Sequence, residues 1–234
     1  NNILGCIHYT KNLNDFKNID FVIEAVTEKK AIKESIFNEL NNICNDDVIL
    51  TTNTSTIPIN QIASYTNNSQ RMKLVCGMHF MNPVPRSKLI EIIPSQYTHS
   101  SVVDIVKQLS TEFGKVYSES KDVVGFIANR ILMPYINEAV FVLYEGIASK
   151  EDIDKTMRLG TNIPMGPLEL CDFIGIDTCL FIQETIYNET NNEKYRVCPL
   201  FYDMINNGKY GCKNGFGFYE YDKPGSYKKK ELTK

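Results

Sequence analysis

Short apolar runs alternate with amphipathic patterns over the first half of the chain. Nearly continuous apolar runs are typical of strands covered on both faces, and they predict strands at 21–26, 48–52, 74–80, 89–93 and 115–117. Apolar residues at helical spacing predict helices at 29–44, 57–65 and 101–113. Strands and helices that alternate in this way favour an α/β layer with parallel strand pairing.

From Gly125 onward the pattern is helical, with almost no strand signal. Ser149 and Asp152 have the spacing of a capping box, which marks the start of a helix. Apolar spacing and such start signals predict helices at 126–147, 149–159, 167–187 and 200–207. We therefore expect an α/β domain over residues 1–120 and an all-α domain over residues 121–234.

Composition narrows the class of protein. The 234 residues are 43% hydrophobic and 23% charged with a net charge of −3, which excludes a disordered chain and disfavours a nucleic-acid partner. No apolar run approaches the roughly 18 residues that a membrane span needs, so we expect no membrane association. The seven cysteines are scattered without a C-x-x-C pair, which predicts no metal site and fits a cytoplasmic protein.

Two polar residues interrupt the predicted strands. His79 ends the strand 74–80, and ligands of parallel α/β sheets bind at the carboxyl ends of strands. A histidine there suits a general acid or base, although a packed histidine that holds a loop is the alternative. Glu91 lies inside an apolar run, where an ionised carboxylate needs a partner. His79 would be that partner, unless Glu91 points to solvent from an edge strand.

Two further segments carry candidate polar groups. Asn53, Thr54 and Ser55 follow the strand 48–52, where they would bind substrate or, taken alone, more simply cap the next helix. Asn129 opens the long apolar helix and suits either a donor into a cleft or a capping role. No G-x-G-x-x-G motif precedes the first predicted strand, so the sheet has too few strands for a complete dinucleotide-binding domain.

These motifs together resemble one family. The chain resembles the 3-hydroxyacyl-CoA dehydrogenases, and most closely the short bacterial 3-hydroxybutyryl-CoA dehydrogenases. Eight blocks carry the resemblance in family order across the whole chain: 22–25 with Glu28, 52–55, 77–85 (GMHFMNPVP), 88–91, 125–130 (GFIANR), 152–154, 164–167 and 215–219 (GFGFY).

The resemblance implies an NAD-dependent oxidoreductase that interconverts an L-3-hydroxyacyl-CoA, here 3-hydroxybutyryl-CoA, and a 3-ketoacyl-CoA, here acetoacetyl-CoA. It implies that His79 is the general base, that Glu91 orients it, and that Ser55 and Asn129 bind the substrate oxygen. The positions that match NAD contacts in the family are Ala25, Glu28, Lys33, Ser55, Asn82 and Lys213. The all-α domain matches the family's dimerisation domain, so we expect a homodimer.

The resemblance also implies an incomplete first domain. In the family, a first strand, a glycine-rich turn, an acidic ribose-binding residue and CoA-contacting helices precede the block that begins at Val22. We therefore expect a partial Rossmann-like domain whose first βαβ unit is missing. One alternative is a non-catalytic fragment that folds and dimerises without NAD. Another is a hydroxy-acid dehydrogenase with a lysine base, which His79, Glu91 and Asn129 argue against.

Overall fold

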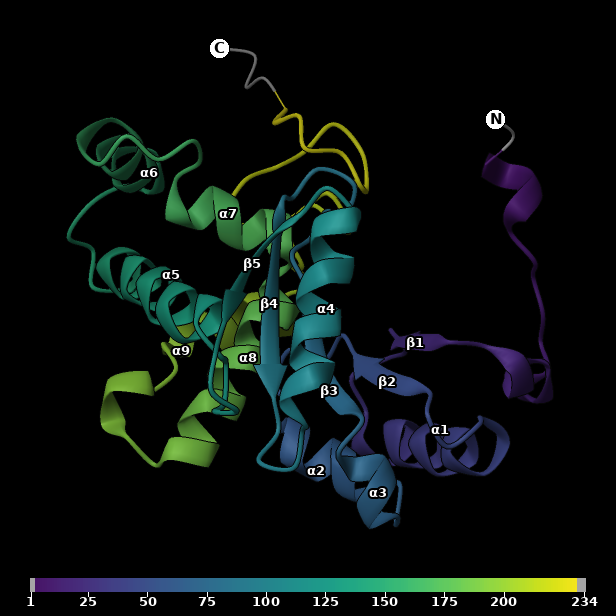
Figure 1. Cartoon of the computed structure of the whole chain (residues 1–234). Helices are drawn as coiled ribbons and strands as arrows, with labels where there is room; N and C mark the ends of the chain where they lie inside the picture. Colours follow the sequence, from purple (N-terminus) through teal and green to yellow (C-terminus); the bar gives the residue numbers. More distant parts are fainter. Residues whose placement is uncertain (1–2, 231–234) are drawn as a thin grey trace. The chain divides into compact units, whose positions relative to one another are not determined.

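The computed structural model describes residues 3–230, with side chains from Gly5 onward. The chain divides into two compact units, Asn1–Phe126 and Ile127–Lys234, and each is described by itself (Figure 1). The first unit is a layered α/β domain and the second is helical, which confirms the expected fold class. Two short 3-10 helices, η1 (Ile3–Cys6) and η2 (Leu13–Asn18), precede the sheet.

The described part of the first unit contains one five-stranded sheet in the order β1-β2-β3-β4-β5. The strands are β1 (Phe21–Glu24), β2 (Ile49–Thr52), β3 (Val75–Phe80), β4 (Leu89–Pro94) and β5 (Val116–Glu119). β1, β2 and β3 are parallel, as are β4 and β5, but β3 and β4 are antiparallel. The expectation of parallel pairing was therefore wrong at this step, because the connection 81–88 is too short for a helical crossover.

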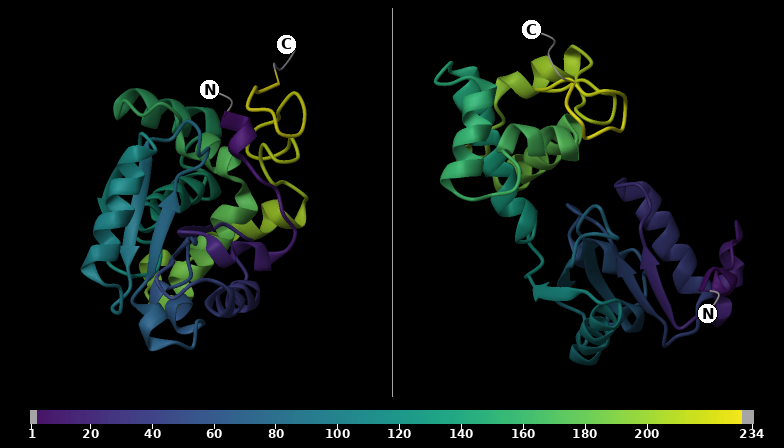
Figure 2. Two further views of the ribbon diagram at one scale, coloured as in Figure 1. Left: turned by 45° about the vertical axis from the view of Figure 1, so that its right-hand side comes forward. Right: turned by 90° about the horizontal axis from the view of Figure 1, so that it is seen from above.

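Helices cover both faces of the sheet (Figure 2). One face packs against α1 (Lys30–Ile43) and α2 (Ile59–Ser64), and α3 (Ser69–Met72) follows α2. The other face packs against α4 (Ser100–Glu112). Within β2, Leu50 points to the first face and Ile49 to the second, as the alternation of strand side chains requires. Helices were expected at α1, α2 and α4, whereas α3 was not.

Gly77 of β3 allows α2 to lie close to the sheet. A Cβ at this position would lie 2.8 Å from Ile59 Cδ1 and 2.9 Å from Ile93 Cβ, which is too close for any side chain. The first backbone amides of α2 are satisfied from elsewhere in the same unit: Asp122 accepts hydrogen bonds from Ile59 N at 2.8 Å and Asn60 N at 2.7 Å. The segment that leaves the sheet after β5 is thereby fixed to α2.

The second unit contains α5 (Ala128–Tyr144), α6 (Lys150–Gly160), α7 (Pro167–Ile174), α8 (Ile176–Thr190), η3 (Glu193–Tyr195) and α9 (Pro199–Asn206). The capping box is confirmed, because the Ser149 side chain accepts a hydrogen bond from Asp152 N at 3.2 Å. The single helix expected over 167–187 is wrong. Gly175 adopts φ +107°, outside the helical region, and divides the segment into α7 and α8.

A buried carboxylate anchors the segment that follows α9. Asp172 of α7 accepts hydrogen bonds from the backbone amides of Phe218 and Tyr219, each at 2.9 Å, and from the Tyr221 hydroxyl at 3.0 Å. Burial raises the pKa of Asp172 to about 6, although these three hydrogen bonds act in the opposite direction. The described helices include none that is long and apolar enough to cross a membrane.

Candidate active site

The antiparallel pairing of β3 and β4 brings the two interrupting polar residues together. His79 lies directly opposite Glu91 in the register, and directly opposed side chains on one face of a sheet are in contact. His79 Nδ1 lies 2.8 Å from Glu91 Oε2, and the two side chains are 7% and 1% exposed. When Glu91 is ionised it only accepts hydrogen bonds, so Nδ1 then carries the ring proton and Nε2 of a neutral ring is an acceptor.

The third member of the site comes from the loop after β2. β2 and β3 are parallel, so their carboxyl ends meet at the same edge of the sheet. Ser55 Oγ lies 3.1 Å from His79 Nε2 and can donate its hydroxyl proton to that nitrogen. The structure thus brings together the candidate residues His79, Glu91 and Ser55. Nδ1 of the imidazole faces Glu91, and Nε2 faces Ser55.

Phe126, which the sequence interpretation assigned to the long helix, instead packs against the imidazole. Its ring lies edge-on to His79, with the ring centroids 5.6 Å apart and the planes at 61°. Gly125 and Phe126 both have positive φ, +77° and +47°, so α5 begins only at Ala128. Non-glycine residues rarely adopt this conformation, and it is found where surrounding packing imposes it.

Asn53 joins the ends of two strands, a role that the sequence did not reveal. Its side-chain Oδ1 accepts a hydrogen bond from Phe80 N at 2.8 Å, directly after His79. Its backbone amide donates to Glu24 O at 2.8 Å. The capping role expected for this loop is not observed, because α2 has Pro58 as its N-cap residue and no side-chain cap; Thr54 Oγ1 instead accepts a hydrogen bond from Ile57 N at 3.0 Å, ahead of the helix.

Glu28 lies beneath the Ser55 loop and its Oε1 accepts four hydrogen bonds. The donors are Thr54 Oγ1 at 2.6 Å, Ser55 N and Thr56 N, each at 2.9 Å, and Thr56 Oγ1 at 3.0 Å. Burial alone raises the pKa of Glu28, but these hydrogen bonds and the Lys33 charge outweigh it and lower the pKa below 4.5. The carboxylate is therefore ionised at neutral pH.

Lys33 is fully buried and its ammonium group bonds within the protein. Nζ lies 2.8 Å from Glu24 Oε1 and 3.5 Å from Glu28 Oε2, and Thr52 Oγ1 donates to Glu24 Oε2 at 2.6 Å. The side chain has no accessible surface for a ligand. Lys33 balances two acidic side chains in this structure, and its expected contact with the cofactor stays a prediction.

The remaining candidate residues divide between the two units. Ala25 follows β1 and Asn82 follows β3, and both are exposed at the carboxyl edge of the sheet. Asn129 lies in the first turn of α5 with 9% exposure. Lys213 Nζ bonds to Asp177 Oδ1 at 2.7 Å and Thr178 Oγ1 at 2.8 Å. Asn129 and Lys213 belong to the second unit, and their roles remain predictions.

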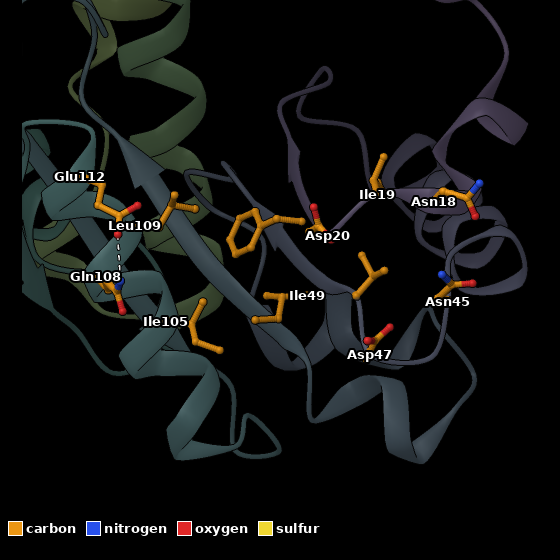
Figure 3. Close-up of a pocket in the computed structure, with 12 residues that line it drawn as sticks. Asn18, Ile19, Asp20, Asn45, Asp47, Ile49, Ile105, Gln108, Leu109 and Glu112 are labelled. Carbon is orange, nitrogen blue, oxygen red and sulfur yellow. Dashed lines mark hydrogen bonds between the residues drawn. The ribbon is translucent and has the colours of Figure 1, made fainter.

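A cavity of about 510 Å³ lies at the opposite, amino-terminal end of the strands (Figure 3). Its lining comes from the residues that lead into β1 and β2 and from the second half of α4, including Asp20, Asp47, Ile105 and Glu112. Neither His79 nor Ser55 is part of this lining, so the cavity is separate from the candidate site. Within the described residues there is no cluster of three histidine, cysteine or acidic side chains that could hold a metal ion.

An α/β sheet with a histidine–carboxylate pair at its carboxyl edge, followed by a helical unit, defines the class of two-domain dehydrogenases. Comparison with known proteins identifies the family. The family model "3-hydroxyacyl-CoA dehydrogenase, NAD binding domain" matches residues 1–123, and "3-hydroxyacyl-CoA dehydrogenase, C-terminal domain" matches residues 125–221. The chain belongs to the 3-hydroxyacyl-CoA dehydrogenase family, and its first unit is the family's NAD-binding domain.

Individual relatives agree with this assignment. The chain is 45% identical over 220 residues to a probable 3-hydroxybutyryl-CoA dehydrogenase of Bacillus subtilis, covering 94% of this chain and 76% of that protein. It is 44% identical over 221 residues to the 3-hydroxybutyryl-CoA dehydrogenase of Clostridioides difficile, covering 94% and 78%. The crystal structure of (S)-3-hydroxybutyryl-CoA dehydrogenase from Ralstonia eutropha matches with a TM-score of 0.87 and 42% identity, covering 92% and 75%.

Proposed function

We propose that the protein interconverts L-3-hydroxybutyryl-CoA and acetoacetyl-CoA with NAD(H), using His79 as the general acid and base. The observation that carries this proposal is the placement of the imidazole between two polar side chains. Nδ1 is bound to the buried Glu91 at 2.8 Å, and Nε2 meets the Ser55 hydroxyl at the carboxyl edge of the sheet. A base held in one tautomer at this edge suits the removal of a proton from a substrate hydroxyl.

In the oxidative direction, His79 Nε2 accepts the proton of the 3-hydroxyl group and becomes an imidazolium. Glu91, whose side chain is only 1% exposed, stabilises the new positive charge across the Nδ1 hydrogen bond. Ser55 turns its hydroxyl from Nε2 to the substrate oxygen and holds it. Bound NAD supplies the hydride acceptor. In the reductive direction, the His79 imidazolium returns the proton to the oxygen.

The exposed residues at the carboxyl ends of β1 and β3 fit the cofactor. Ala25 carries the smallest side chain that has a Cβ, which allows a ring to approach the backbone, and Asn82 offers both an amide donor and an acceptor. These two residues would hold NAD, with Ser55 as a further family position of the same unit. Ligands of α/β sheets bind at this edge, which supports the placement.

The test is NADH consumption by this chain with acetoacetyl-CoA, followed by absorbance. We expect turnover, and we expect His79→Gln to lower kcat about 10²- to 10⁴-fold, the contribution of a positioned general acid or base. The matched control is His8→Gln, the same substitution at an exposed histidine, which should leave kcat unchanged. A folded chain that neither binds NADH nor turns over acetoacetyl-CoA would support the alternative, a non-catalytic fragment that folds and dimerises.

The proposed function includes a homodimer that works in the cytoplasm. The second unit exposes large apolar side chains that a second copy would cover, among them Ile147 at 67% and Leu159 at 72% exposure. The six cysteines from Cys44 onward are buried thiols, which suits a reducing compartment. Light scattering should give twice the mass of one chain, and a mass of one chain at micromolar concentration would contradict the dimer.

A further inference from the structure

The Glu28 carboxylate and the Ser55 loop form a single hydrogen-bonded unit. Glu28 follows β1 in the sequence, whereas residues 54–56 follow β2, and the two segments meet because β1 and β2 are parallel neighbours. All four donors of the loop converge on one carboxylate oxygen, Glu28 Oε1, at distances from 2.6 to 3.0 Å. Hydrogen bonds to a charged acceptor are about twice as strong as those between neutral groups.

This arrangement binds the backbone amides of Ser55 and Thr56 and the side-chain hydroxyls of Thr54 and Thr56. The amide of Ser55 is bound directly, and Thr54 and Thr56 are bound on either side of it. With its backbone held, Ser55 has rotation about χ1 as its main remaining freedom. The position of its Oγ, 3.1 Å from His79 Nε2, therefore depends on Glu28 although Glu28 does not contact His79 in any described bond.

Lys33 and Glu24 support the carboxylate from the interior. The Lys33 ammonium lies 3.5 Å from Glu28 Oε2 and 2.8 Å from Glu24 Oε1, and it is inaccessible to water. The ammonium therefore favours the charged form of Glu28. Thr52 Oγ1 donates to the same Glu24 and connects the support to the end of β2. The network thus runs from β1 and α1 to the serine loop.

We propose that Glu28 is a positioning residue for the reaction, which acts by holding the loop that places the Ser55 hydroxyl beside His79 Nε2 and the substrate oxygen. The inference rests on the proposed function for its effect on turnover, and it gives Glu28 a role other than cofactor contact. It predicts that loss of the Glu28 charge releases the Ser55 loop. The Ser55 hydroxyl then no longer has a fixed position relative to His79 and the substrate oxygen. Misplacement of about 1 Å costs on the order of 10²-fold in rate.

The kinetic test compares Glu28→Gln, Ser55→Ala and the double variant. We expect Glu28→Gln to lower kcat about 10- to 100-fold with an unchanged NADH dissociation constant, and to add little in the Ser55→Ala background. The matched control is Glu39→Gln on an exposed position of α1, which should be silent. A higher NADH dissociation constant with unchanged kcat, or effects that multiply in the double variant, would overturn the proposal.

Two further measurements separate this proposal from protein stability and from the proposed function. Thr56→Val removes one donor to Glu28 and leaves the carboxylate in place, so it should lower kcat in the same direction by a smaller factor. The NMR signal of the His79 Cε1 proton should move in Glu28→Gln as it does in Ser55→Ala, and not in Glu39→Gln, whether or not the chain turns over. If the His79 signal of folded Glu28→Gln does not move, the positioning role is refuted. If that signal moves but the wild-type chain is inactive, only the proposed dehydrogenase function is refuted.

Discussion

Replacement of Glu91 by glutamine isolates the charge of the His79–Glu91 pair. The glutamine keeps the size of the side chain, and its Oε1 can still accept the hydrogen bond from His79 Nδ1 that Glu91 Oε2 accepts at 2.8 Å. The tautomer of the neutral imidazole is thereby retained. What is lost is the negative charge that faces the imidazolium formed during the reaction. Glu91→Gln should therefore lower kcat and leave the binding of substrate and cofactor nearly unchanged.

The magnitude follows from the separation of the two charges. Unit charges about 4 Å apart interact by about 4 kcal/mol at an effective dielectric constant near 20. At about 1.4 kcal/mol per factor of ten, full loss of that interaction corresponds to about 10³-fold in rate. The amide dipole of glutamine retains a part of the interaction, so we expect a decrease of about 10²- to 10³-fold in kcat.

The assay is NADH oxidation at saturating acetoacetyl-CoA, together with KM values and thermal unfolding of each variant. Glu119→Gln, a more exposed carboxylate on β5, is the matched control and should leave kcat unchanged. A Glu91→Gln protein that folds normally and keeps kcat within about threefold of wild type would show that charge compensation of His79 does not drive the reaction.

Three further predictions concern stability, each measured by urea unfolding. Lys33→Met should lower the free energy of unfolding by about 3–5 kcal/mol, because it leaves the buried Glu24 carboxylate without its ion-pair partner. Adding Glu24→Gln should recover much of this loss, and equal stability of the single and double variants would contradict the prediction. Asp172 holds its proton more tightly in the folded state, with a pKa of about 6 against 3.8 when unfolded, so its contribution should fall by about 2 kcal/mol as pH rises from 4 to 6, and Asp172→Asn should remove that slope. Gly175→Ala should destabilise by more than Gly208→Ala, because φ +107° at Gly175 lies outside the left-handed region that alanine can adopt, whereas Gly208 at φ +69° lies inside it and is open; equal losses would refute this backbone argument.

Strand and helix positions could be predicted from the sequence wherever the apolar residues follow a single spacing, either that of a strand or that of a helix. The expected strands and helices of the first unit appear within a few residues of their predicted ends, because apolar spacing reports burial directly. The antiparallel turn between β3 and β4 was missed, although the connection 81–88 contains two prolines and no helical period. Gly175 was likewise a visible interruption, but the apolar period continues on both sides of it and favoured a single helix.

Some contacts of the candidate site could likewise be predicted from the sequence, and others could not. A carboxylate in an apolar run must have a partner, so Glu91 could be paired with His79 from the sequence. The four bonds of Glu28 join segments that lie 26 to 28 residues apart, and no local pattern reports such convergence. Phe126 was assigned to the helix by its apolar period. Its positive φ and its contact with His79 become visible only in three dimensions.

Two carboxylates thus act on the same imidazole by different physical routes. Glu91 contacts His79 directly from β4, so its charge changes the energy of the protonated ring. Glu28 has its described bonds to the loop and to Lys33, so it changes where the Ser55 hydroxyl lies. Loss of the Glu91 charge should alter the proton transfer itself. Loss of the Glu28 charge should misplace the Ser55 hydroxyl beside an otherwise intact base, His79. The double variant Glu28→Gln with Glu91→Gln should therefore show nearly multiplicative losses in kcat, unlike Glu28→Gln with Ser55→Ala.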